Sequence, residues 1–328
     1  MSYAIAAVVV GFIAVVWGAD RFVYGAAGLA RNLGVSRLVI GLTIVAFGTS
    51  APEMVVSGMA AAAGSRAMGI GNAIGSNITN ATLVLGAAAI ASPLRVHSRL
   101  LIREIPFLFL IMAVAWALLA DGLLSLIDGI VLLTGMFVLL AWIGAQARKE
   151  SPGELDPLAA GVEDGNIPDS IATPRAVSLF AIGLLVVLVG SRVLVWGAVQ
   201  MAHDLGVSEL VVGLTLVALG TSLPELAASV AAARHGEDDI AIGNVVGSNM
   251  FNLLGVLALP GIIAPGTVDR SVVAVDFPIM VGVTLLVVLM ARNKRSHIGR
   301  KRGFALVVVF VGYFVMQFAT SPLPHAGL

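Results

Sequence analysis

The sequence contains two copies of a motif that sets a proline and a glutamate inside a strongly apolar stretch. The first copy, GTSAPE, ends at Glu53, and the second, GTSLPE, ends at Glu225. An ionisable group deep in an apolar span costs about 3 kcal/mol or more unless it faces a partner or a water-filled cavity, so it typically marks an ion or substrate path. We therefore predict that Glu53 and Glu225 bind a cation. The alternative is a structural role in which each glutamate bonds a neighbouring helix.

The residues around each glutamate supply further oxygen atoms. Pro52 and Pro224 each remove one helical hydrogen bond and clash with the carbonyl group four residues earlier. We expect a broken helix at each motif, with the carbonyl oxygens of Ala46 and Ala218 free to face a cation; an ordinary proline kink is the other interpretation. The hydroxyl groups beside the prolines belong to Thr49, Ser50, Thr221 and Ser222.

A second motif follows each of the first and also occurs twice, as GNAIGSNITN from Gly71 and GNVVGSNMFN from Gly243. Its serine and its last asparagine are four residues apart, so they share one face of a helix. These candidate ligands are Ser76 and Asn80 in the first copy and Ser248 and Asn252 in the second. For the other asparagines, at 72, 77, 244 and 249, we favour hydrogen bonds between helices over ion binding.

The candidate site consists of carboxylate, amide, hydroxyl and carbonyl oxygens. The chain has no cysteine, and its five histidines fall in loops or at span ends. An all-oxygen set suits hard cations such as Ca²⁺ and Na⁺ and does not suit zinc or copper. Two carboxylates neutralise one divalent ion, or most of the charge of a few monovalent ions, so competition for them predicts ion exchange.

The composition predicts an all-α polytopic membrane protein, because 59% of the 328 residues are hydrophobic and only 12% are charged. A membrane span needs about 20 apolar residues. On that rule we predict ten transmembrane helices, at residues 4–30, 37–63, 67–91, 101–120, 124–147, 174–202, 208–233, 239–264, 272–291 and 303–320. A polar segment, 148–173, separates the halves 1–147 and 174–328 and is interpreted as a linker.

The two halves are repeats of one another. The segments VIGLTIVAFGTSAPEMVVSG, from Val39, and VVGLTLVALGTSLPELAASV, from Val211, match at more than half of their positions. Because each half has five predicted spans, an odd number, the second must enter the membrane from the opposite side, which gives an inverted repeat of the kind found in secondary transporters. Fifteen of the 19 lysines and arginines lie on the side of the linker and two on the other, which predicts a cytoplasmic linker, both termini outside, and a location in the cell inner (plasma) membrane.

These paired motifs resemble the two alpha-repeats of the calcium/cation antiporter superfamily, most closely its bacterial and archaeal sodium/calcium exchanger branch. The resemblance implies that Glu53 and Glu225 hold Ca²⁺ with backbone oxygens near Thr49 and Thr221. It also implies that Na⁺ uses these glutamates, the serines at 50, 76, 222 and 248, and the Ala46 and Ala218 carbonyls. Some members carry one aspartate where this chain has Asn80 and Asn252, which leaves the ion stoichiometry open. The resemblance further implies that the first and sixth helices are long and tilted and slide to switch access.

The sequence therefore predicts an antiporter that exchanges Ca²⁺ for Na⁺ by alternating access, with no covalent chemistry, no resident cofactor and no nucleic-acid partner. Its expected partners are the lipid bilayer and the two ions, and the sequence identifies no protein partner. Two alternatives remain open: a Ca²⁺/H⁺ antiporter on the same scaffold, and, from another class, a cation channel or a non-transporting membrane scaffold.

Overall fold

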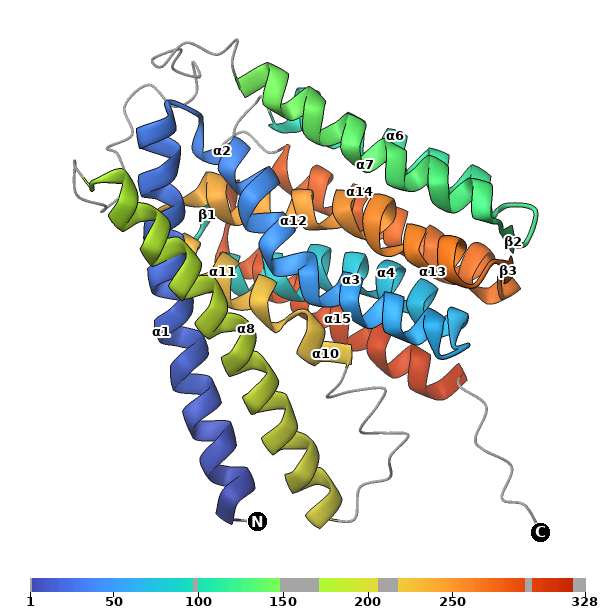
Figure 1. Ribbon diagram of the computed structural model, residues 1–328, viewed down its shortest axis with the longest axis horizontal. Helices are drawn as coiled ribbons and strands as arrows, with labels where there is room; N and C mark the ends of the chain where they lie inside the picture. Colours follow the sequence, from blue (N-terminus) through green and yellow to red (C-terminus); the bar gives the residue numbers. More distant parts are fainter. Residues whose placement is uncertain (1, 97–99, 148–170, 206–217, 293–296, 321–328) are drawn as a thin grey trace.

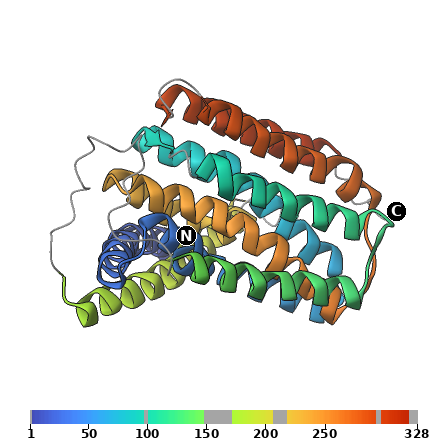
Figure 2. The same cartoon turned by 90° about the horizontal axis from the view of Figure 1, so that it is seen from above.

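A pair of long helices crosses a bundle of roughly parallel helices obliquely (Figure 1). The computed structural model describes residues 2–96, 100–147, 171–205, 218–292 and 297–320. The crossing pair is α1 (Ser2–Leu33) and α8 (Thr173–Asp204). Seen from above, the bundle helices run side by side while α1 is viewed nearly end-on (Figure 2).

The remaining elements of the first half form four helical passages. They are α2 (Arg37–Ile40), η1 (Gly41–Val45) and α3 (Ala46–Ala62); α4 (Arg66–Thr79), η2 (Asn80–Val84) and α5 (Leu85–Ala91); η3 (Leu100–Glu104) and α6 (Ile105–Leu119); and α7 (Leu126–Ala147), where η denotes a π-helical segment. Two short strands, β1 (Leu94–Arg95) and β2 (Leu123–Leu124), follow α5 and α6.

The second half has the same order. Its elements after α8 are α10 (Ala218–Thr221) and α11 (Leu223–Arg234); α12 (Asp238–Phe251), η5 (Asn252–Val256) and α13 (Ala258–Ile263); η6 (Val272–Asp276) and α14 (Phe277–Ala291); and α15 (Arg300–Thr320). Its strands are β3 (Gly266–Thr267) and β4 (His297–Ile298). Each strand pairs with one from the other half, β1 with β4 and β2 with β3, so two small ribbons join the halves.

Eight helices in the described part of the chain are long and apolar enough to cross a membrane. They correspond to eight of the ten predicted spans. The predicted span 208–233 begins in residues outside the described part and continues as α10 and α11. The predicted span 303–320 lies within α15, a helix of 21 residues that is not among the eight. The linker 148–173 falls almost wholly outside the described residues.

The helix of the first proline motif is continuous, so the expected break there is wrong. Helix α3 passes through Pro52 without interruption. Pro52 leaves the Gly48 carbonyl without its helical donor, and membrane helices tolerate one such lost bond within a packed bundle. The second motif is interrupted as expected, because Ser222 leaves helical geometry between α10 and α11.

Glycines allow α1 and α8 to pack with their backbones in contact. A Cβ atom at Gly18 would lie 2.9 Å from the backbone nitrogen of Val187, and one at Gly190 would lie 3.1 Å from that of Val15. A Cβ atom at either position would force the partner helix to shift, so glycine lets the two backbones pack at close range. The glycines along this contact form what we call the glycine stripe: Gly11, Gly18 and Gly25 on α1 and Gly183, Gly190 and Gly197 on α8.

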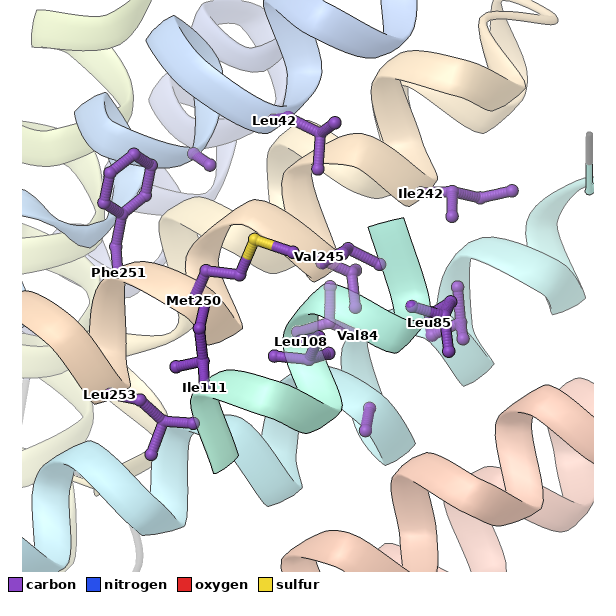
Figure 3. Packing of buried hydrophobic residues seen from close by; sticks show 14 of the residues in the cluster. Leu42, Val84, Leu85, Leu108, Ile111, Ile242, Val245, Met250, Phe251 and Leu253 are labelled. Atoms are coloured by element: carbon purple, nitrogen blue, oxygen red, sulfur yellow. The ribbon is translucent and has the colours of Figure 1, made fainter. Parts of the chain in front are cut away.

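Helix α12 lies at the centre of the bundle and is buried along most of its length. Its apolar side chains, including Val245 and Met250, pack among Leu42 of η1 and Leu108 of α6 (Figure 3). A helix that is buried on nearly all sides holds its position through packing. The polar residues of α12 are therefore held at a fixed place inside the molecule.

Arg66 fastens the start of α4 to the segment that follows α13. Its guanidinium group donates to the carbonyl oxygens of Ala264 at 3.0 Å, Pro265 at 2.9 Å and Thr267 at 3.1 Å. We expect Arg66→Gln to lower the free energy of unfolding by about 1–2 kcal/mol, because the hydrogen bonds are charge-assisted but partly exposed to solvent. Thermal unfolding of the detergent-solubilised protein measures this, with Arg270→Gln, on the exposed surface nearby, as the control. Equal losses in the two variants would contradict it.

Candidate functional site

The two glutamates lie on α3 and α11, and these two helices pack against each other and against α12. Glu53 on α3 and Glu225 on α11 are each 1% exposed. Ser50, one helical turn before Glu53 on α3, contacts the carboxylate of Glu225. The fold therefore brings one carboxylate from each half of the chain to a single buried place.

Most of the other predicted site residues are buried around this place. Thr49, Ser50, Ser248, Ser76, Ser222, Asn80, Asn252 and Ala46 are all at most 5% exposed. Thr221 is half-buried at the end of α10. Ala218 is the first residue of that helix.

Hydrogen bonds tie the first half of the site to the second. Ser50 Oγ donates to Glu225 Oε1 at 3.2 Å. Thr49 Oγ1 lies 3.5 Å from Ser248 Oγ, where either hydroxyl can donate. Residues of the first proline motif thus contact residues of both motifs in the second half.

The electrostatics of this arrangement favour a bound cation. Two ionised carboxylates in a buried site repel each other and have lost their hydration, which is costly unless a positive charge lies near both. Among the described residues, Glu53 Oε2, Glu225 Oε2, Ser222 Oγ and the side-chain amides of Asn80 and Asn252 are buried without a hydrogen-bond partner. The site therefore offers carboxylate, amide and hydroxyl oxygens to a hard cation.

A conventional cluster of metal-binding side chains is absent from the described residues, where no three His, Cys, Asp or Glu side chains come together. A cation held here would have to take the rest of its ligands from hydroxyl, amide and backbone oxygens. Such mixed sets are typical of Ca²⁺ and Na⁺ sites and not of zinc sites.

Sequence reasoning missed the π-helical turns at the site. Segments η2 and η5 begin at Asn80 and Asn252, the last residues of the two second motifs. A π-helical turn adds a residue to the helix and is frequent at functional sites. The regular spacing of apolar residues that predicts an α-helix does not reveal a π-helical turn. Once the turn at Asn80 is known, however, the repeat in the sequence predicts a second turn at Asn252.

The remaining asparagines of the second motifs form the hydrogen bonds between helices that the sequence predicts. Asn77 Nδ2 donates to Met280 Sδ at 3.3 Å, and Asn249 Nδ2 donates to the Asn77 carbonyl at 3.5 Å. Asn72 and Asn244 donate to backbone and hydroxyl oxygens of α3 and α11. These last two contact the glutamate backbones themselves.

The fold and the buried carboxylates define an all-helical polytopic membrane protein with an oxygen-lined centre. The chain belongs to the sodium/calcium exchanger protein family, whose model matches residues 3–144 and 175–319. Members of this family are transporters and not enzymes.

Relatives match along nearly the whole chain. The inner membrane protein YrbG of Escherichia coli is 39% identical over 323 residues, which cover 98% of this chain and 99% of that protein. The sodium/calcium exchanger MaX1 of Methanosarcina acetivorans is 31% identical and is aligned over 94% of this chain and 96% of its own length. A solved structure of the sodium-calcium exchanger NCX_Mj matches with a TM-score of 0.82 at 34% identity, covering 98% of this chain and 99% of that one.

Proposed function

We propose that this protein is a secondary active antiporter that exchanges Ca²⁺ for Na⁺ across the membrane by alternating access. The observation that carries the proposal is the burial of Glu53 and Glu225, one from each half, on helices joined by the Ser50–Glu225 hydrogen bond and surrounded by oxygen atoms. Membership of the sodium/calcium exchanger family and the names of MaX1 and NCX_Mj support the choice of ions.

In this proposal Ca²⁺ is bound chiefly by the two glutamates together with backbone oxygens of Thr49 and Thr221. Na⁺ uses the same glutamates, so the two ions compete. Its further ligands are the side chains of Ser50, Ser76, Ser222 and Ser248 and the carbonyl oxygens of Ala46 and Ala218, with Asn80 and Asn252 beside them. The chain needs no resident cofactor, since the two ions are its cargo.

The proposed architecture is ten transmembrane helices in two inverted repeats, 1–147 and 174–328, joined by a cytoplasmic linker at 148–173. The positions of the π-helical segments support the repeat. The number of residues from η2 to η5, and from η3 to η6, equals the number from Glu53 to Glu225. The excess of lysine and arginine on one side supports an orientation with both termini outside. The name of the E. coli relative supports a location in the inner membrane.

Transport requires two conformations that differ in their affinity for the ions, because a ligand shifts a conformational equilibrium only by its differential affinity. The closely packed pair α1 and α8 is suited to act as one unit in such a change, since its backbones are in contact along the glycine stripe. The site would then open to one side of the membrane and to the other in turn.

The counter-ion is tested by calcium uptake into vesicles that contain the purified protein. We expect uptake into sodium-loaded vesicles to saturate with Ca²⁺ and to stop when the sodium gradient is removed, whereas clamping the pH on both sides leaves it unchanged. Competition between Na⁺ and Ca²⁺ for the two glutamates is the physical reason. Uptake that persists without sodium but collapses under the pH clamp would establish the Ca²⁺/H⁺ antiporter instead, and flux that does not saturate would indicate a channel.

A further inference from the structure

Two asparagines outside the predicted ligand set contact the backbone of the two glutamates. Asn72 Nδ2 on α4 donates to the Glu53 carbonyl at 3.2 Å and to Ser57 Oγ at 3.1 Å. In the second half, Asn244 Nδ2 on α12 donates to the Glu225 carbonyl at 3.3 Å and to Ser229 Oγ at 2.9 Å. The same set of atoms thus occurs once in each repeat.

Each amide fixes one helix against another at the level of the glutamate. Glu53 and Ser57 are four residues apart on α3, so they lie on one face of the helix, and a single amide group holds both. Ser57 Oγ in turn donates to the Gly69 carbonyl on α4 at 3.1 Å. Rotation or sliding of α3 relative to α4 would break these bonds together.

The position of the glutamate backbone matters because the side chain reaches its cation through three rotatable bonds. A displacement of the backbone by a fraction of an ångström changes which carboxylate positions lie within about 2.3–2.6 Å of a calcium ion. Ligands that are held in advance also lose less conformational entropy when the ion binds. The asparagine contact therefore acts on the ion through the glutamate.

Asn244 also connects the two halves of the site. Its Oδ1 accepts a hydrogen bond from Thr49 Oγ1 at 3.1 Å, and the residue is fully buried. The same side chain thus bonds the backbone of Glu225 in the second half and the hydroxyl of Thr49 in the first. Its oxygen faces this hydroxyl, which argues against a direct role as an ion ligand.

We propose that Asn72 and Asn244 are positioning residues that hold Glu53 and Glu225 in the geometry required for selective Ca²⁺ binding, without binding the ion themselves. The inference rests on the proposed function, since it assumes that the two glutamates bind Ca²⁺. It assigns to the first asparagine of each second motif a role distinct from that of Ser76, Ser248, Asn80 and Asn252.

The test is ion-dependent thermal stabilisation of the purified full-length protein, titrated separately with Ca²⁺ and Sr²⁺. A ligand that binds only the folded state raises the free energy of unfolding by RT ln(1 + [L]/Kd), so the titration gives an affinity whatever the counter-ion. We expect Asn244→Ala and Asn72→Ala each to weaken Ca²⁺ binding about ten-fold, the effect of one lost buried hydrogen bond. Sr²⁺, a larger ion, should lose less affinity, because a loosened site discriminates less by size.

The matched controls are Ser229→Ala and Ser57→Ala. Each removes a hydroxyl contact between the same two helices but leaves the bond from the asparagine to the glutamate carbonyl in place, and neither serine is a predicted ligand. We expect both to lower the melting temperature without changing the ratio of Sr²⁺ to Ca²⁺ affinity. The positioning role is refuted if the serine variants lower Ca²⁺ affinity as much as the asparagine variants do. It is also refuted if the asparagine variants leave Ca²⁺ affinity unchanged.

The outcomes distinguish an error in the positioning role from an error in the proposed calcium site. If the wild-type protein shows no stabilisation by Ca²⁺, the proposed calcium site itself is wrong and the inference falls with it. If the wild type is stabilised and Asn244→Ala behaves like the wild type, only the positioning role is wrong. Should Asn244→Ala fail to fold, Asn72→Ala, whose side chain is only partly buried, decides the question by the same criteria.

Discussion

Glu53→Gln and Glu225→Gln will each abolish measurable calcium transport. Either substitution keeps the size of the side chain but removes one of the two buried negative charges. Removing one partner of a desolvated charge interaction costs about 3 kcal/mol, or roughly 100-fold in affinity. The measurement is Ca²⁺ uptake into sodium-loaded vesicles, with protein content matched between variants.

Asp276→Asn is the matched control for the two glutamates. Asp276 is also an acidic residue in an apolar helical segment, but it lies in η6 and accepts hydrogen bonds from Tyr313 at 3.2 Å and from Gln317 at 2.5 Å. We expect this variant to transport Ca²⁺ at close to the wild-type rate. Normal transport by either glutamine variant would show that the site is assigned to the wrong carboxylates.

Gly183→Val will separate α1 from α8 and strongly destabilise the protein. A Cβ atom at residue 183 would lie 2.7 Å from the Phe22 Cα atom and 2.8 Å from the Gly18 carbonyl oxygen. Backbone atoms cannot move aside alone, so the whole helix must shift, and overpacking of this kind costs about 3 kcal/mol. We expect a lower melting temperature and a loss of most transport, since the pair can no longer move as one unit.

Gly282→Val provides the control for this glycine. At residue 282, in α14, no described heavy atom comes within 4 Å of such a Cβ atom. The substitution adds the same side chain to a membrane helix without a clash in the described structure, and we expect little change. Gly190→Ala should fall between the two, because its Cβ atom would lie 3.0 Å from the Ala14 side chain. Equal stability of all three variants would mean that close backbone contact between α1 and α8 is unimportant.

Much of the arrangement around the glutamates could be predicted from the sequence, because the information is local and occurs twice. The depth of Glu53 and Glu225 within apolar stretches indicates burial, and the four-residue spacing of Ser76 and Asn80 places both on one face. The inverted duplication predicts that the two glutamates approach from opposite halves. That they bind Ca²⁺ stays a prediction.

Other features could not be predicted, because they depend on neighbours distant in the sequence. The continuity of α3 through Pro52 depends on packing against neighbouring helices, including α4 and α12. The buried Glu237, paired with Arg37 at 3.2 Å, lies in an acidic run that from sequence alone resembles an exposed loop. The bonds from Asn72 and Asn244 to the glutamate carbonyls require the register of two helices, which no single helix specifies.

The most direct test of the central claim is a crystal structure of the purified protein soaked with Sr²⁺ and measured at a wavelength where strontium scatters anomalously. Strontium resembles calcium in charge and in its preference for oxygen ligands, and its anomalous signal identifies it independently of water. We predict one strong peak between the carboxylates of Glu53 and Glu225, which disappears in Glu225→Gln crystals and weakens as Na⁺ is added. A peak elsewhere in the molecule, or none between these carboxylates at saturating Sr²⁺, would contradict the account.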